Sequence, residues 1–477
     1  MLNERNKRIF IILSCCFLIS LCFFLTLQMR SEWLDKSLNG HLSRETAHTA
    51  CVTKNWLNEG ALNLRFLYIS WPDSEKYDLI QERGPYVSYP PGAIFPVFIL
   101  AKIFQVDNLV LIISSYNLTT QYIIAILLFL LMFMVLEYFK EAKGINIFFS
   151  IIPSLIYLYT PPTLYWHMIV YFADEAVMVL FALFVFLETK RYLYKGLSRM
   201  LNLVSMAVVF LGTFTDWLFV FIVLIAITLR MFFDDKPEFS RRRILSMLDL
   251  IVPAGLAIGL FFYQIVPLGL FEKLVSTFNR RHLSGPDGVV SNFFVQHFYY
   301  FVISLNGYIL CVSAVICAIL LLFCYFSAMF GKWNAGNKEV IKVYTRLALL
   351  VTLPCCLQIY IFQQHSIVHD FSALKWSLPL ALIPFGIFPL LFNRLIKHSR
   401  SYQFIIRIFL TAYILLLILG VFHRTLDWYK RLFQLWKQRD IKISEVIKDD
   451  YGRKDPCFYL FLERNSRLNR RPASLKK

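Results

Sequence analysis

Long blocks of apolar residues, each near the length that crosses a lipid bilayer, dominate this sequence. The stretches 122–136 and 404–421 are nearly free of charge, and comparable blocks recur along the whole chain. A hydrocarbon core about 30 Å thick needs roughly 20 apolar residues in a helix. Only 17% of the residues are charged, too few for a soluble surface of this size. The blocks predict an all-α polytopic membrane protein and exclude a disordered chain, a coiled coil and a soluble enzyme.

The net charge of +18, from 49 Lys and Arg against 31 Asp and Glu, calls for an anionic partner. The basic residues lie in short segments between apolar blocks and in the C-terminal tail, and no basic helix is interleaved with aromatic residues. This distribution is typical of membrane orientation and of contact with anionic headgroups. We therefore expect membrane lipids as partners and no nucleic acid.

The apolar run 9–29 follows three basic residues and has no small-residue cleavage site, which predicts an uncleaved signal anchor with a cytoplasmic N-terminus. Residues 93–104 are too few for a comfortable span and predict a re-entrant or interfacial helix. The block 298–328 contains Asn306-Gly307, so its first third is expected in the interface. Together with the first run we expect eleven spans, the others at 117–138, 145–160, 172–188, 200–214, 217–232, 248–267, 298–328, 345–363, 374–393 and 403–422.

The charge distribution agrees with this topology. The segments expected in the cytoplasm hold 21 Lys and Arg, and the short loops on the other side hold 3. Such an excess marks cytoplasmic loops. The chain then divides into a signal-anchor span (1–29), a first extracytoplasmic loop with surface helices (30–116), a transmembrane bundle (117–423) and a basic tail (424–477).

The first loop carries two local signals. Ser43 is a helix start signal, apolar or small residues recur after it, and Gly60 is a stop signal, which predicts an amphipathic helix lying on the membrane surface. Glu45 and His48 would lie one turn apart on nearly the same face. Further on, Tyr89-Pro90-Pro91-Gly92 enforces a rigid turn before the apolar stretch 93–104.

This order of features resembles the polytopic GT-C-type glycosyltransferases that use polyprenyl-phosphate-linked sugars, among them protein O-mannosyltransferases and lipid A aminoarabinose transferases. In that family an Asp or Glu begins the first loop about fifteen residues before a Gly, and Pro-Pro follows. Here Glu45 stands fifteen residues before Gly60, and Pro90-Pro91 follow. The resemblance covers roughly residues 1–230. The chain departs from it at Arg44-Glu45, where relatives often carry two acids.

The resemblance implies an inverting transfer of a sugar from a polyprenyl-phosphate donor to a lipid-linked or envelope glycan acceptor. It places the active site on the outer, extracytoplasmic face of the bacterial cytoplasmic membrane. Glu45 matches the base that deprotonates the acceptor, and Asp174 matches the acid of the second outside loop. The side chains expected to bind substrate are His48, Tyr89, His167, Glu175, Asp216, Arg280, Arg281, His365, His369 and Lys375.

Each of these residues also has a structural interpretation. Glu45 falls in the first turn of a helix, where acids are favourable without any catalytic role. Asp174 and Glu175 stand at the end of an apolar span, where acids are costly unless paired, and Asp174 could pair with His167. Asp216 lies in the break of the 200–232 block, which tolerates a solvated acid.

Two later loops are dense in polar groups. Residues 363–375 could bind phosphate through Lys375 with help from His365 and His369. The two histidines and Asp370 also have atoms that could bind Mg²⁺ or Mn²⁺, and a hydrogen-bonded interfacial loop is the alternative. Arg280 and Arg281 form a basic cluster on the side where such charge is rare, which indicates a phosphate role or an anchor to headgroups. No cofactor follows from the sequence.

Other functions remain open. A polysaccharide polymerase or ligase also has many spans and a large outside loop, and a sugar or lipid transporter (flippase) would place ionisable residues in mid-span. A non-catalytic assembly factor is a further alternative. Gly-rich phosphate loops, HExxH and GxSxG are missing from the sequence, which counts against an ATPase, a zinc protease and a serine hydrolase.

Overall fold

The structure is a computed structural model in which helices make up most of the chain. It describes residues 4–34, 43–69, 79–106, 108–142, 144–234, 241–282, 306–331, 335–368, 370–391 and 411–427, with 408 and 430 besides. Within these residues there is no strand, and a single antiparallel bridge joins Tyr68 to Tyr86. The tail beyond residue 430 and the expected span 403–422 up to residue 410, except Ile408, lie outside this description.

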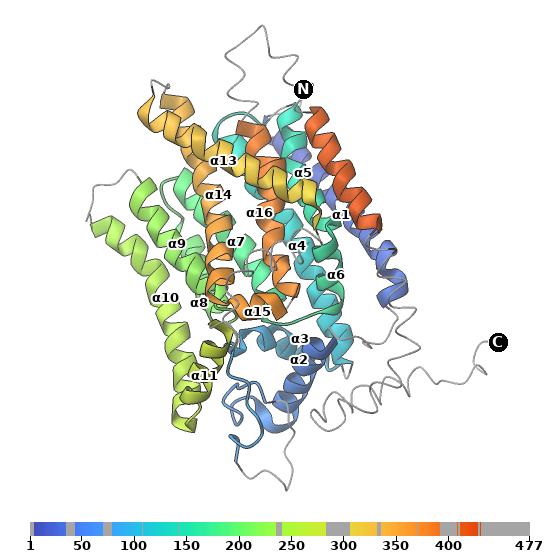
Figure 1. Ribbon diagram of the computed structural model, residues 1–477, viewed down its shortest axis with the longest axis vertical. Coiled ribbons are helices and arrows are strands. Elements are labelled where there is room, and N and C mark those ends of the chain that lie inside the picture. Colours follow the sequence, from blue (N-terminus) through green and yellow to red (C-terminus); the bar gives the residue numbers. More distant parts are fainter. Residues whose placement is uncertain are drawn as a thin grey trace, which may run out of the picture.

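The long helices lie side by side in one bundle, and α2, α3 and α11 gather at one end of it (Figure 1). In chain order the helices are α1 (Glu4–Leu34), α2 (Ser43–Asn55), η1 (Trp56–Gly60), η2 (Pro91–Ala93), α3 (Ile94–Phe104), α4 (Leu109–Tyr138), α5 (Ile145–Tyr159), α6 (Pro161–Ile169), α7 (Ala173–Leu193), α8 (Arg199–Thr213), α9 (Leu218–Phe233), α10 (Arg241–Ile265), η3 (Val266–Leu268), α11 (Phe271–His282), α13 (Tyr308–Phe330), α14 (Ala335–Ile361), α15 (Gln363–Val368), η5 (Asp370–Trp376), α16 (Ser377–Leu382) and η6 (Ile383–Ile387), followed by a helix at 411–427.

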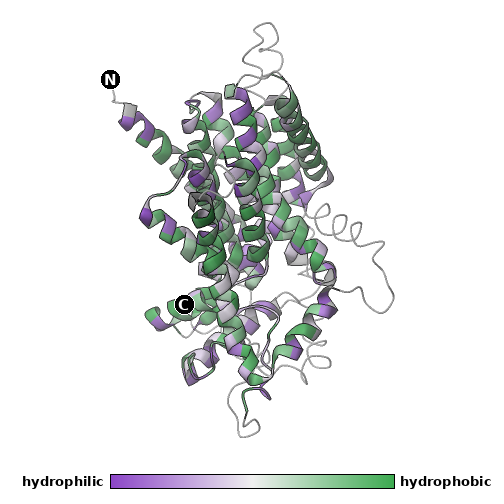
Figure 2. Ribbon diagram, turned by 90° about the vertical axis from the view of Figure 1, so that its left-hand side faces the viewer, coloured by the Kyte–Doolittle hydropathy of each residue, from purple (hydrophilic) through white to green (hydrophobic). Residues whose placement is uncertain are grey.

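Among the described residues, six helices are long and apolar enough to cross a membrane, and a seventh span is formed if α5 and α6, bent by 54° at their junction, count as one. The chain is therefore an all-helical membrane protein. Large apolar side chains face outward, such as Phe17 (72% exposed) and Phe330 (88% exposed). Hydrophobic residues predominate along the long helices in Figure 2.

Helices α8 and α9 belong to the apolar block 200–232, which is half again as long as one span. The structure breaks this block after Thr213 and resumes it at Leu218, as the polar residues between them predict. At 15 and 16 residues, α8 and α9 are shorter than a full span. Helix α3, at the predicted re-entrant stretch, is also a short apolar helix.

The helix predicted in the first loop begins at Ser43 and runs through α2 and η1 to Gly60, where the backbone turns with φ +91°. Its predicted position on the membrane surface needs correction. Val52 and Trp56 are almost fully buried in a cluster formed by the loop after Gly60 and by α3, and Ala50 on another side of α2 is buried as well. Protein, rather than lipid, covers the apolar side of this helix.

Candidate functional site

Helix α7 opens with two acids in its first turn, Asp174 and Glu175, both fully buried. Glu175 Oε2 accepts a hydrogen bond from the backbone N–H of Phe172 at 3.0 Å. Carboxylates are favourable at a helix N-terminus because the first N–H groups lack intrahelical acceptors. Glu175 therefore caps the helix, whereas Asp174 is available for contacts with other elements.

Asp174 forms an ion pair with Lys375, which follows it by some 200 residues in the sequence. Lys375 Nζ lies 2.5 Å from Asp174 Oδ1 and 3.1 Å from Asp216 Oδ2. All three side chains are 2% exposed or less. We call Asp174, Asp216 and Lys375 the Lys375 cluster. Its two carboxylates and one ammonium leave a formal charge of −1 in a buried setting.

Asp216 is held on its other side by backbone and amide donors. Its Oδ1 accepts from the Leu218 N–H at 2.6 Å and from Gln358 Nε2 at 2.9 Å. Burial raises the pKa of the Asp216 carboxyl above its ordinary value, Lys375 opposes this rise, and Asp174 adds to it. The break between α8 and α9 thus fixes a carboxylate against α14, which carries Gln358.

His365, on α15, joins the cluster to the Pro-Pro turn. Its Nε2 lies 2.9 Å from the Tyr89 hydroxyl and 4.0 Å from Asp174 Oδ2. Burial lowers the pKa of His365 to about 4, so the ring is neutral at pH 7. A neutral imidazole can donate or accept a proton in a hydrogen bond, which suits a position between a phenol and a carboxylate.

A group of aromatic rings lies beside these charges, joined to them by the hydrogen bond between Tyr89 and His365. Tyr68, Tyr86, Tyr89 and His48 surround Phe172, with ring centroids 5.6 to 6.3 Å from it. We call these five residues the aromatic wall. Helix α2 brings His48 to the wall, because the side chains of Thr46 and Thr49 bond to the backbone of residue 171 at 2.9 and 3.2 Å. Glu45, half-buried, is the neighbour of Thr46 on the same helix.

The basic cluster of the late loop reaches the same wall from α11. Arg281 Nη2 donates to the Tyr86 hydroxyl at 2.7 Å, and its guanidinium carbon lies 4.9 Å from the Tyr89 ring centroid. Lys273 donates to the Pro85 carbonyl at 2.7 Å. A guanidinium on aromatic faces is an electrostatically favourable arrangement. Helix α11 therefore carries positive charge to the side of the site where the tyrosines stand.

The structure brings most of the sequence-predicted residues together. Five of them lie in or beside the Lys375 cluster: Asp174, Glu175, Asp216, Lys375 and His365. Three more lie in or against the aromatic wall: His48, Tyr89 and Arg281. The side chain of Arg280 and all of His369 lie outside the described residues. Glu45 lies on the helix anchored beside this assembly.

His167 lies apart from the cluster. Its Nδ1 is 2.9 Å from Asn117 Oδ1 and its Nε2 is 2.8 Å from the Tyr157 hydroxyl, and the ring is fully buried. Both ring nitrogens are therefore used within the bundle. The alternative pairing of Asp174 with His167 is wrong, since Asp174 pairs with Lys375 instead.

Sequence reasoning missed Tyr68 and Gln358. Gln358 carried a signal, because it is a polar residue inside an otherwise apolar span. Tyr68 carried none, since tyrosines are frequent throughout the chain. Within the described ranges, no group of three or more His, Cys, Asp or Glu is arranged to hold a metal ion.

Comparison with known proteins adds no name to this site. No protein-family model matches the chain, and no curated protein matches it either.

Proposed function

We propose that this protein is a membrane glycosyltransferase of the GT-C type. It would move a sugar from a polyprenyl-phosphate donor to a lipid-linked or envelope glycan acceptor on the outer face of a bacterial cytoplasmic membrane. The observation that carries the proposal is the buried Lys375 cluster, which His365 joins to Tyr89 of the aromatic wall. In this proposal the chain has eleven spans and a cytoplasmic N-terminus.

The transfer forms a bond between the acceptor oxygen and the anomeric carbon and breaks the bond from that carbon to the phosphate oxygen. A carboxylate takes the acceptor proton, and polyprenyl phosphate leaves with the electron pair. Glu45 and Asp174 are the two candidates for this carboxylate. Glu45 is the preferred candidate, because it matches the base of the resembling family and because Asp174 is held by Lys375 at 2.5 Å.

The leaving phosphate needs positive charge at the position where its own charge develops. Arg281 suits this role, since its described contacts are with the Tyr86 hydroxyl and the Tyr89 ring and not with a carboxylate. A guanidinium also presents a fork of donors that matches phosphate oxygens. Lys375 is less suitable, because it already balances two carboxylates.

The position of the charges favours chemistry at the membrane surface over transport. The cluster stands at the first turn of α7 and in the break before α9, so the middles of these helices remain apolar. Transporters place ionisable groups near the middle of the bilayer. A polysaccharide polymerase or ligase would share the same surface chemistry, and the identity of the product separates it from a single-sugar transferase.

The test is a mass profile of envelope glycans from a deletion strain that carries the wild type, Glu45→Gln, Asp174→Asn or Glu82→Gln. Glu82 is an exposed acid of the same loop and is the matched control. Membrane abundance of each variant is measured in parallel. We expect the deletion to lose one sugar, the control to restore it, and at least one of the other variants to fail at normal abundance.

A deletion that leaves every glycan unchanged would overturn the proposal and favour a transporter or an assembly factor. A deletion that shortens whole polymers instead of removing one sugar would favour the polymerase. If Glu45→Gln restores the sugar and Asp174→Asn does not, Asp174 is the base.

A further inference from the structure

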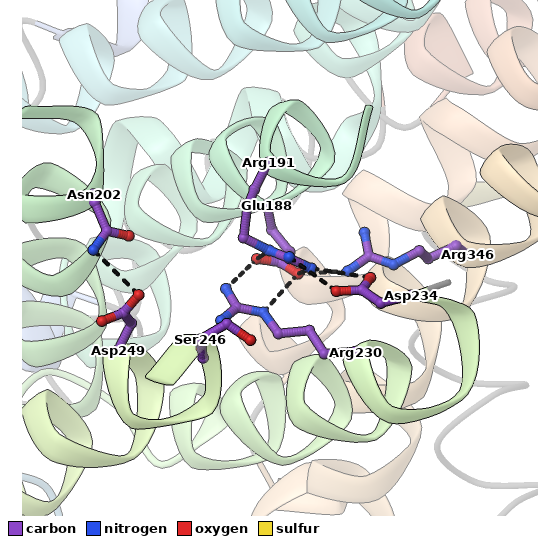
Figure 3. Close-up of polar contacts among 8 residues, drawn as sticks. All are labelled: Glu188, Arg191, Asn202, Arg230, Asp234, Ser246, Asp249 and Arg346. Carbon is purple, nitrogen blue, oxygen red and sulfur yellow. Dashed lines mark hydrogen bonds and ion pairs between the residues drawn. The ribbon is translucent and has the colours of Figure 1, made fainter. Parts of the chain in front are cut away.

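A second buried cluster of charges lies at the other end of α7, around Glu188 (Figure 3). Its carboxylate, 1% exposed, accepts hydrogen bonds from three arginines of the described chain. Arg191 and Arg230 each donate through two nitrogens, and Arg346 Nη2 lies 2.5 Å from Glu188 Oε1. Asp234 accepts from Arg191 at 3.0 Å.

The partners of Glu188 come from different helices. Glu188 and Arg191 belong to α7, Arg230 to α9 and Arg346 to α14, and Arg230 also donates to the carbonyl of Ser246 on α10. One carboxylate therefore ties α7, α9 and α14 together. The guanidinium of Arg346 stacks on Tyr192 of α7 at 4.4 Å, which adds a second contact between α7 and α14.

The same three helices bring the candidate site together at their opposite ends. Asp174 is in the first turn of α7, Asp216 bonds to the first residue of α9, and Gln358, which bonds to Asp216, is in the last turns of α14. With a rise of about 1.5 Å per residue, the two clusters are roughly 20 Å apart along these helices. A packed helix moves as a rigid element, so a shift at one end displaces the other.

We infer that the Glu188–Arg346 pair is a positioning device. It fixes the axial position of α14 relative to α7 and thereby sets how Gln358 and the chain after α14 place Asp216 and Lys375 against Asp174. The inference rests on the proposed function only where activity is measured; the displacement of α14 is measured without it.

Two substitutions with the same change of charge separate positioning from general stability. Glu188, Asp234 and the three arginines of the cluster carry a formal charge of +1. Either Arg346→Met or Arg191→Met leaves two acids and two arginines, which balance. Arg346→Met removes the link from α7 to α14. Arg191→Met, the matched control, retains the links through Arg230 and Arg346, since Arg191 is on the same helix as Glu188.

Cys355 reports the position of α14 at the site. It is fully buried, and its Sγ lies 3.4 Å from the Lys375 carbonyl oxygen. In purified protein with Cys356→Ala in every variant, N-ethylmaleimide labelling of Cys355 is followed by peptide mass spectrometry. Because labelling requires local opening, we expect about tenfold faster modification in Arg346→Met, and the wild-type rate in Arg191→Met.

The second readout is sugar transfer. A displacement on the order of 1 Å can lower a rate about a hundredfold, so we expect Arg346→Met to lower kcat with little change of KM. Equal labelling of Cys355 in all three proteins, or equal acceleration in both variants, would overturn the inference. If the labelling responds as expected while the wild type transfers no sugar, the proposed function fails and the positioning role stands.

Discussion

The backbone N–H of Gly92 donates a hydrogen bond to the carbonyl oxygen of Phe214 at 2.7 Å. This bond joins the Pro-Pro turn of the first loop to the break between α8 and α9, two residues before Asp216. The indole of Trp217 donates to the Ser88 carbonyl at 2.8 Å, a second hydrogen bond between the same two segments. Two features that are about 120 residues apart in the sequence thus form one support for the candidate site.

Gly92→Ala tests this support. A Cβ at residue 92 would lie 2.3 Å from Phe214 O and 2.4 Å from Thr215 Oγ1, so the turn must move away from the break. We expect transfer activity to fall at least about tenfold, because the support of Asp216 shifts. Activity per folded molecule is the measurement. Gly255→Ala, where nothing lies within 4 Å, is the control that should remain active.

Lys375→Met is expected to lower the free energy of unfolding by about 3–5 kcal/mol, because it leaves two buried carboxylates without their cation. Adding Asp174→Asn to this variant restores the native formal charge of the Lys375 cluster and should recover much of the loss without restoring activity. Thermal unfolding in detergent, followed by tryptophan fluorescence, gives both values. If Lys375→Met alone is as stable as the wild type, Lys375 is not needed to compensate the charge of the two acids.

His365 makes stability depend on pH. Its pKa is lowered from 6.5 to about 4 by burial, so between these values the unfolded chain binds more protons than the native protein. Native stability therefore falls as the pH drops through this window, by roughly 3 kcal/mol at most. His365→Gln cannot titrate and should lose this part of the dependence. Unfolding of both proteins at about pH 7 and about pH 4.5 checks the difference.

His167→Phe should destabilise the bundle and leave the chemistry intact. The substitution removes two buried hydrogen bonds and leaves Asn117 and Tyr157 with unsatisfied groups, at a cost of roughly 1–3 kcal/mol. We expect a lower melting temperature and unchanged activity per folded molecule. Lost activity at an unchanged melting temperature would instead support the substrate-binding role that the resemblance implies for His167.

Tyr68→Phe should have the opposite effect. The Tyr68 hydroxyl is buried and has no hydrogen-bond partner among the described residues, and the ring stands in the aromatic wall. An unpaired buried hydroxyl costs roughly 1–3 kcal/mol, so its removal should leave the melting temperature unchanged or raise it. If activity falls at the same time, the hydroxyl serves a ligand. A clear loss of stability would mean that this hydroxyl has a partner.

Much of the fold could be predicted from the sequence, because hydrophobic blocks and their interruptions are local signals. The start at Ser43, the stop at Gly60 and the break at Asp216 all appear where the residues predict them. The bounds of the longer helices were less accurate. Helix α14 begins at Ala335 instead of 345, because its first turns carry polar residues that a hydropathy argument assigns to a loop.

The candidate site could be predicted as a set of residues but not as a set of pairs. Polar residues at the ends of apolar spans are suspects on physical grounds, which together with the family resemblance and the polar loop 363–375 pointed to Asp174, Asp216 and Lys375. Their contact depends on the packing of α7, α9 and the segment after α14, which no local pattern encodes. In the sequence, Arg191, Arg230 and Arg346 indicate only membrane orientation, because their convergence on Glu188 depends on how α7, α9 and α14 pack.

The separation between Asp216 and Lys375 has a consequence for biosynthesis. The two residues are 159 positions apart, so both carboxylates of the cluster leave the ribosome long before the lysine that pairs with them. At about 5–20 residues per second, this interval lasts roughly 8–30 seconds. During this interval the nascent chain contains two acids that cannot be buried as an ion pair. A chain that ends before residue 375 never acquires the lysine that pairs with them. Membrane quality control would therefore have a chemical mark that distinguishes an unfinished copy of this protein from a complete one.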